Sequence, residues 1–164
     1  MSTYVIVDGL NTFMRCKHGR GDIDLRIGMA QHIMFNSLRK MWRDFQADHI
    51  VFCLEGRSWR KDFYKPYKAN RKVKAAQRSP REIEDDQLYM ESFDALVTFL
   101  QEKTNVSVIQ HPECEADDLI AVWTQAHPDD QHIIISTDSD FHQLLAPNIR
   151  QYDGVQDKIV TVEG

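Results

Sequence analysis

Short apolar runs recur along the chain, and most of them are followed by an acidic residue. Residues 132–135 contain three consecutive isoleucines without a charged neighbour, which is typical of a strand covered on both faces. Residues 4–7, 49–54 and 106–109 form three further runs that favour strands. We therefore expect a central, mostly parallel sheet.

The segments between these runs show helical spacing. Apolar residues recur at intervals of three and four over residues 23–45 and 84–101, which predicts two amphipathic helices. Another helix is expected over about residues 113–123 and a short one over 141–145, and residues 68–77 also favour a helix. Strands that alternate with helices predict an α/β fold with a Rossmann-like sheet and helices on both of its faces.

Two smaller features complete this prediction. Asn11 and Thr12 are expected to cap the segment after the first strand, which glycines make loop-like up to about residue 22. Residues 150–152 and 158–162 are expected to pair as a hairpin across Asp153 and Gly154. No internal repeat or linker divides the sequence, so we expect one domain.

Composition bounds the class of protein. A chain of 164 residues with 42% hydrophobic residues is large enough for one domain with a core. The N-terminus lacks a signal-peptide layout and no apolar run is long enough to span a membrane. The three cysteines and seven histidines show no zinc-site spacing. We expect a soluble cytoplasmic protein with reduced cysteines and no membrane partner.

Acidic residues follow three of the predicted strands, at Asp8, Glu55 and Asp138. In open α/β sheets ligands bind beyond the carboxyl ends of the strands, so these acids stand where chemistry is usually done. If the three strands are neighbours, their acids converge with others at the start of the helix near residue 115. The converging set is Asp8, Glu55, Glu115, Asp117, Asp118, Asp138 and Asp140.

Each of these acids also has a structural explanation. Asp138 and Asp140 are suited to a turn and a helix cap, and acids in a first helical turn compensate the helix dipole. Several carboxylates in one cleft would, however, raise one another's pKa unless cations bind there. Oxygen ligands without His or Cys select Mg²⁺ or Mn²⁺, and two such ions about 4 Å apart promote phosphodiester hydrolysis.

Charge is distributed unevenly. The net charge is −5, yet residues 57–81 contain ten basic residues and one acid and carry +9, which leaves −14 on the remainder. Aromatic residues alternate with the basic ones here, as binding to phosphates and unpaired bases requires. A solvated basic loop is the alternative. Together with the acidic set, this segment predicts a metal-dependent nuclease.

Four motifs also resemble those of the 5′ nuclease superfamily, which includes flap endonucleases, phage 5′→3′ exonucleases such as the T-even phage ribonuclease H, and the 5′ nuclease domain of bacterial DNA polymerase I. The matching residues are Asp8, Tyr67-Lys68-Ala69-Asn70-Arg71, Glu115-Ala116-Asp117-Asp118 and Ser136-Thr137-Asp138-Ser139-Asp140-Phe141. The resemblance implies a PIN-like nuclease domain in which the seven acids bind two Mg²⁺ ions, with Asp8 and Asp138 as catalytic residues.

The resemblance further implies that residues 57–82 form a basic arch or clamp. Lys68 and Arg71 match residues that contact the scissile phosphate, and Tyr67 matches a position that stacks on a base. The expected nucleic-acid-binding residues are Arg57, Arg60, Lys61, Lys65, Tyr67, Lys68, Arg71 and Lys72.

Two features depart from the family pattern. Glu55 stands where the family usually has Asp, with a shorter gap before Trp59. The family also continues into a helix-three-turn-helix element that grips duplex DNA, and this sequence ends at Gly164, about where that element would begin. We expect the element to be absent from this chain, which is then a fragment, works with a separately encoded element, or works without one.

The leading hypothesis is a Mg²⁺-dependent 5′ nuclease that acts on DNA with 5′ ends or flaps, or on RNA/DNA hybrids during primer removal, beside replication proteins. A PIN-type endoribonuclease would share the acidic cleft without needing the basic segment. A non-catalytic nucleic-acid-binding module is the third hypothesis.

Overall fold

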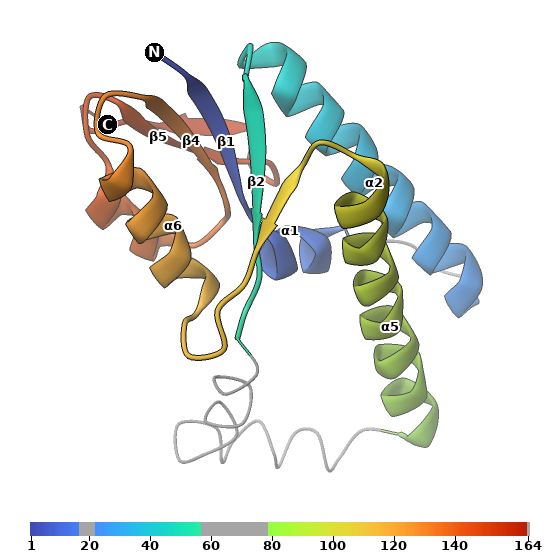
Figure 1. Ribbon diagram of the computed structural model, residues 1–164. Coiled ribbons are helices and arrows are strands. Elements are labelled where there is room, and N and C mark those ends of the chain that lie inside the picture. Colours follow the sequence, from blue (N-terminus) through green and yellow to red (C-terminus); the bar gives the residue numbers. More distant parts are fainter. Residues whose placement is uncertain (17–21, 57–78, 164) are drawn as a thin grey trace.

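A six-stranded sheet forms the centre of the computed structural model, which describes residues 1–16, 22–56 and 79–163 (Figure 1). The strand order is β3-β2-β1-β4-β5-β6. The strands are β1 (Thr3–Asp8), β2 (His49–Cys53), β3 (Ser107–Ile109), β4 (Gln131–Ile135), β5 (Ile149–Asp153) and β6 (Lys158–Val160). The helices are α1 (Gly9–Arg15), α2 (Ile23–Asp44), α5 (Pro80–Lys103), α6 (Ala116–Ala126) and the 3₁₀ helix η2 (Ser139–Leu144).

The predicted parallel sheet is confirmed, and its three acid-bearing strands are neighbours. β1 pairs in parallel with β2 on one side and with β4 on the other. The register places Asp8 opposite Cys53, and Val7 opposite Ile135. The carboxyl ends of these strands therefore meet at one edge of the sheet.

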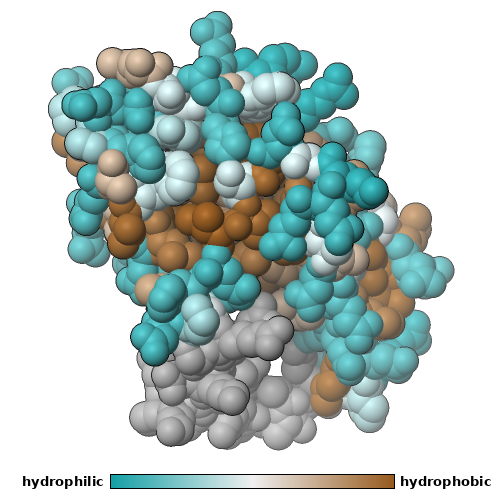
Figure 2. Space-filling view, viewed as in Figure 1, coloured by the Kyte–Doolittle hydropathy of each residue, from teal (hydrophilic) through white to brown (hydrophobic). Residues whose placement is uncertain are grey.

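Each face of the sheet packs against its own helices. Alternate residues such as Val5 and Phe52 join the larger core cluster with α1, α2 and α5. The residues between them, such as Ile6 and Val51, pack against α6 and η2 on the opposite face. Figure 1 shows α2 and α5 side by side and α6 across the sheet from them. In the same view, Figure 2 shows a central apolar band bordered by hydrophilic side chains.

Both long helices begin at side-chain caps. Asp22 accepts a hydrogen bond from the backbone nitrogen of Leu25 at the start of α2, and Ser79 accepts one from Glu82 at the start of α5. The two helices are joined by an ion pair between Arg26 and Asp85. α2 matches the predicted helix closely, whereas α5 is longer than predicted because Pro80 is accommodated in its first turn.

Two predictions need correction. Asn11 does not cap a later helix, because α1 begins directly at Gly9 and Asn11 lies inside it. The short helix near Phe141 is a 3₁₀ helix that begins earlier, at Ser139. The predicted hairpin is confirmed as β5 and β6, and β5 in addition pairs in parallel with β4 and so extends the main sheet. The helix predicted over residues 68–77 lies outside the described residues. Among the described helices, none is long and apolar enough to cross a membrane.

Candidate active site

Acidic side chains gather where β1, β2 and β4 end. Ile6, Cys53 and Ile134 face α6, and the alternation of a strand carries Asp8, Glu55 and Ser136 to that same side of the sheet. The α6 helix begins beside them, so its first turn adds more carboxylates. The site is thus built by three parallel strands and one helix start, as the positions of the acids in the sequence predict.

Asp8 is the most enclosed of these acids, with 8% of its surface exposed. Ser136 Oγ donates a hydrogen bond to Asp8 Oδ2 at 3.3 Å. Burial raises the pKa of Asp8 to about 6, and the charges of Asp117 and Asp138 add to the rise while the Ser136 hydrogen bond opposes it. The Asp8 carboxyl group therefore keeps its proton to a higher pH than an ordinary aspartate does, and a nearby positive charge would lower its pKa.

Glu55 links the end of β2 to the start of α6. Its Oε2 atom accepts a hydrogen bond from the backbone nitrogen of Ala116 at 3.0 Å, one of the free N–H groups at the helix start. Burial raises the pKa of Glu55 to about 7, with contributions from Asp8, Glu115 and Asp117. The pKa of Asp117 is raised as well, first by burial and then by Asp118. These carboxylates therefore share one electrostatic environment.

The structural explanation of Asp138 as a helix cap is confirmed, and Asp118 also makes a capping contact. Asp138 caps η2, because its Oδ1 atom accepts a hydrogen bond from the backbone nitrogen of Asp140 at 2.9 Å. Asp118 Oδ2 accepts one from the backbone nitrogen of Glu115 at 3.1 Å and completes a capping box with Glu115. Asp138 still lies within electrostatic reach of Asp8 and Asp117. Asp118 and Asp140 are exposed at the rim.

The acids converge without forming a closed coordination shell. No group of three His, Cys, Asp or Glu side chains within residues 1–16, 22–56 and 79–163 is arranged to hold a metal ion as the side chains lie. The donor set nevertheless fits a hard divalent cation, since it consists of carboxylate oxygens. Burial and mutual repulsion raise the pKa values of Asp8 and Glu55, and a bound cation would lower both.

The sequence of this chain matches a known protein family. The family described as "5′-3′ exonuclease, N-terminal resolvase-like domain" matches residues 3–164. The chain belongs to this family. The acids of the exonuclease domain thus lie at the edge where its three central strands end.

Similar proteins are known in bacteria and in a phage. The chain is 32% identical to flap endonuclease Xni of Shewanella woodyi over 99% of its own length, and 31% identical to that of Psychromonas ingrahamii over 98%. It spans about 61% and 60% of those two relatives. A solved structure of the 5′-exonuclease of bacteriophage T5 with bound zinc matches 98% of this chain and 58% of that one, with a TM-score of 0.78 and 22% identity. The fold of the exonuclease domain is therefore the PIN-like fold of that enzyme.

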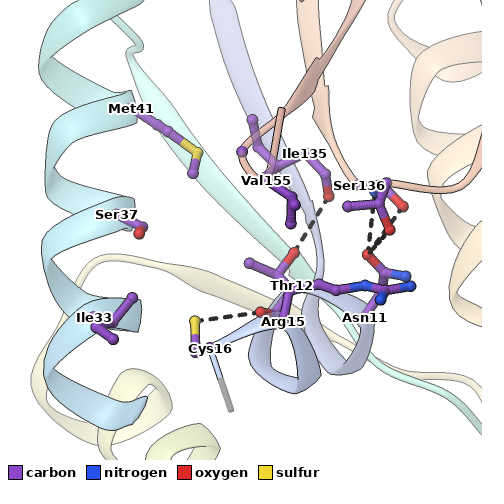
Figure 3. A pocket seen from close by; sticks show the side chains of 12 residues that line it. Asn11, Thr12, Arg15, Cys16, Ile33, Ser37, Met41, Ile135, Ser136 and Val155 are labelled. Atoms are coloured by element: carbon purple, nitrogen blue, oxygen red, sulfur yellow. Dashed lines mark hydrogen bonds between the residues drawn. The ribbon is translucent and has the colours of Figure 1, made fainter. Parts of the chain in front are cut away.

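Asn11 is a site residue that its position in the sequence did not reveal. Its Oδ1 atom accepts hydrogen bonds from the backbone nitrogen and the hydroxyl of Thr137, both at 3.2 Å. Ser136 Oγ lies 3.4 Å from the same atom, where its single proton is shared between Asn11 and Asp8. Figure 3 shows these bonds beside a cavity of about 270 Å³ that Arg15 also lines. The available signal was the helical spacing of three between Asp8 and Asn11, which places both near the same end of the sheet.

The predicted nucleic-acid-binding residues lie outside the described part of the chain. These are Arg57, Arg60, Lys61, Lys65, Tyr67, Lys68, Arg71 and Lys72. Their roles, including the catalytic roles of Lys68 and Arg71, remain predictions. Of the residues that flank this part of the sequence, Gly56 follows Glu55 at the acidic edge and Ser79 caps α5.

In EDTA, the free energy of unfolding of the exonuclease domain should receive a contribution from Asp8 that falls as pH rises. The pKa of Asp8 is 3.8 in the unfolded chain and about 6 in the fold, so the folded state binds the proton more tightly. This contribution is complete below the unfolded value and is lost as pH rises through 6. The loss is on the order of 2 to 3 kcal/mol.

Urea unfolding of the wild type and of Asp8→Asn, measured in EDTA between about pH 4 and pH 8, checks this expectation. The difference between the two proteins reports the loss of Asp8 together with the lower pKa that this loss causes at Glu55. It cancels the contribution of distant titrating groups, such as the buried His132, whose pKa burial lowers. Above pH 7, excess Mg²⁺ should stabilise the wild type more than the variant. A stability difference that stays constant with pH would contradict the expectation.

Proposed function

We propose that this chain is the catalytic domain of a metal-dependent 5′ nuclease that hydrolyses phosphodiester bonds in DNA, as a 5′→3′ exonuclease or flap endonuclease. The observation that carries the proposal is the convergence of Asp8, Glu55, Asp117 and Asp138 on one edge of the sheet. An acidic edge of this kind in a 5′-3′ exonuclease family member is best explained by metal-assisted hydrolysis.

The expected cofactor is Mg²⁺, with Mn²⁺ as a substitute and two ions per site. Asp8, Glu55, Asp117 and Asp138 would hold the ions, and Glu115, Asp118 and Asp140 would complete the site from its rim. When bound, the ions supply an activated water and neutralise charge on the leaving oxygen. The chain itself supplies fixed carboxylates: Ser136 orients Asp8, and the α6 start orients Glu55.

The expected substrates are DNA ends and flaps, and RNA/DNA hybrids are a further candidate. The curated relatives are named flap endonucleases, and the T5 flap endonuclease of the same fold has been solved with DNA and metal ions. The basic segment over residues 57–82 would contact the substrate, with Lys68 and Arg71 on the scissile phosphate and Tyr67 on a base. A helix-three-turn-helix element in a partner or elsewhere in the protein, together with replication proteins, would provide the grip on duplex DNA.

Cleavage assays on 5′-flap DNA, single-stranded DNA, single-stranded RNA and RNA/DNA hybrid test the proposal in Mg²⁺ and in EDTA. Mg²⁺-dependent release of product from the 5′ end of DNA is the expected result. Cleavage of RNA alone would favour a PIN-type endoribonuclease instead. DNA binding that survives EDTA, without cleavage of any substrate even after the protein is supplied with a helix-three-turn-helix element, would identify a non-catalytic binding module.

A further inference from the structure

One buried amide side chain holds the turn that carries Asp138. Gln151 lies in β5 with 2% of its surface exposed. Its Nε2 atom donates one hydrogen bond to the carbonyl oxygen of Ser136 at 3.0 Å and another to the carbonyl oxygen of Asp138 at 2.9 Å. The two carbonyls belong to the connection between β4 and η2. Gln151 therefore fixes the backbone on both sides of Thr137.

The orientation of this amide is determined by its surroundings. Exchanging the nitrogen and oxygen of Gln151 would place Oε1 against two carbonyl oxygens, which accept hydrogen bonds and cannot donate them. In the observed orientation Oε1 is buried and has no hydrogen-bond partner among the described residues. Burying an unpaired oxygen costs free energy, which an apolar side chain would avoid. Ile149, on the same side of β5, is such a side chain. The presence of an amide is therefore best explained by the turn that it holds.

The turn is anchored from both sides. Asn11 accepts the hydrogen bond of the Thr137 backbone nitrogen from the α1 side, and Gln151 donates to the flanking carbonyls from the β5 side. Between these anchors, Ser136 Oγ contacts Asp8 and accepts a hydrogen bond from the backbone nitrogen of Asp138 at 3.1 Å. The direction of the Asp138 carboxylate thus depends on both anchors. Without Gln151, the β5 side would keep the backbone hydrogen bond from the Ser136 nitrogen to the carbonyl oxygen of Tyr152 at 3.3 Å, but the carbonyls of Ser136 and Asp138 would lose their bonds to the amide.

We propose that Gln151 is a positioning residue that orients Asp138 toward Asp8 for divalent metal binding. The inference rests on the proposed function, since it assigns a purpose to the turn only if the acidic edge binds metal. Gln151 is not proposed as a metal ligand, because its amide nitrogen contacts the carbonyls of the turn. Partners that orient the ligands of a metal typically change its affinity by about 10-fold to 100-fold when they are removed.

Gln151→Met tests the proposal, because Met has a similar length and lacks both donors. Mn²⁺ affinity is measured from the electron paramagnetic resonance signal of free Mn²⁺, which does not require the protein to be active. We expect the Kd for Mn²⁺ to rise by about 10-fold. We expect the Mg²⁺ concentration for half-maximal cleavage to rise by a similar factor, while the rate at saturating Mg²⁺ falls less. Gln151→Glu, which keeps the shape and has at most one donor, should shift Mn²⁺ affinity in the same direction.

Asn148 offers a matched control at the opposite end of β4 and β5, just before both strands begin. Its Nδ2 atom also donates to two carbonyl oxygens, those of Pro128 at 3.1 Å and Asp130 at 2.9 Å. Asn148→Leu therefore removes an equivalent pair of hydrogen bonds, far from the acidic edge. We expect it to lower the melting temperature, as Gln151→Met does, without changing Mn²⁺ affinity.

Unchanged Mn²⁺ affinity in folded Gln151→Met, or an equal change in Asn148→Leu, would overturn the proposal. Failure of the proposed function gives a different result. If the wild type binds Mn²⁺ and cuts no nucleic acid even when it is supplied with a helix-three-turn-helix element, the nuclease assignment fails. A selective loss of Mn²⁺ affinity in Gln151→Met would still support the positioning role.

Discussion

Asp138→Asn should lower the rate of Mg²⁺-dependent flap cleavage by more than about 100-fold and leave the fold intact. Asp138 Oδ1 accepts the hydrogen bond that caps η2. Asn has an oxygen at the same position, so the cap is kept. The variant loses a negative charge that lies within electrostatic reach of Asp8 and Asp117. A cation bound at this edge would need that charge. Initial rates over a Mg²⁺ titration, together with thermal unfolding in EDTA, measure both effects.

Asp48→Asn is the matched control for this change of charge. Asp48 lies at the opposite end of the sheet, where its Oδ2 atom accepts a hydrogen bond from the backbone nitrogen of Thr3 at 2.8 Å. The Asp48→Asn variant should cleave DNA at the wild-type rate, because Asp48 lies far from the proposed metal ligands. Wild-type cleavage by Asp138→Asn, or an equal loss in Asp48→Asn, would remove Asp138 from the catalytic set.

The mostly parallel sheet and the positions of the acids at the ends of its strands could be predicted from the sequence. The order of the strands, on which the convergence of the acids depends, could not. A parallel strand that is covered on both faces has apolar residues at successive positions. Ile133 and Ile135 face one core cluster and Ile134 faces the other. Acids directly after such strands then fall at one edge by geometry alone. The helical spacing in residues 23–45 likewise predicted α2, because only one side of this helix is apolar and faces the sheet.

Contacts between distant segments could not be predicted in this way. The bond from Ala116 to Glu55 joins residues 61 positions apart, and Gln151 reaches the turn from a strand that looked like part of a separate hairpin. Hydrophobic periodicity predicts which side of a strand is buried, but it does not predict which polar atom a buried amide side chain will contact. Asn11 was misassigned for a related reason. A polar residue soon after a strand is suited to a helix cap, and only the early start of α1 makes it a tertiary contact.

Gly56→Val should lower the free energy of unfolding by about 3 kcal/mol or more and also weaken Mg²⁺-dependent cleavage. A Cβ atom at Gly56 would collide with the carbonyl oxygen of His111 and lie 2.6 Å from that of Pro112. Both obstacles are backbone atoms, so no side-chain rotation relieves the overlap. The segment before α6 must move away from the end of β2. That movement would break the hydrogen bond between Ala116 and Glu55.

Gly28→Val provides the comparison, because Gly28 is exposed in α2 and nothing lies within 4 Å of a Cβ atom there. It should change the free energy of unfolding by less than about 1 kcal/mol, since the helix propensities of Val and Gly differ little. Urea unfolding and Mn²⁺ titration of both variants measure stability and site integrity together. If Gly56→Val is as stable and binds Mn²⁺ as tightly as Gly28→Val, the close approach of these two backbones does not position Glu55. Loss of stability and of Mn²⁺ binding in Gly56→Val alone would mean that this glycine sets the distance between β2 and α6. That distance in turn sets the spacing of the acids on which the proposed hydrolysis depends.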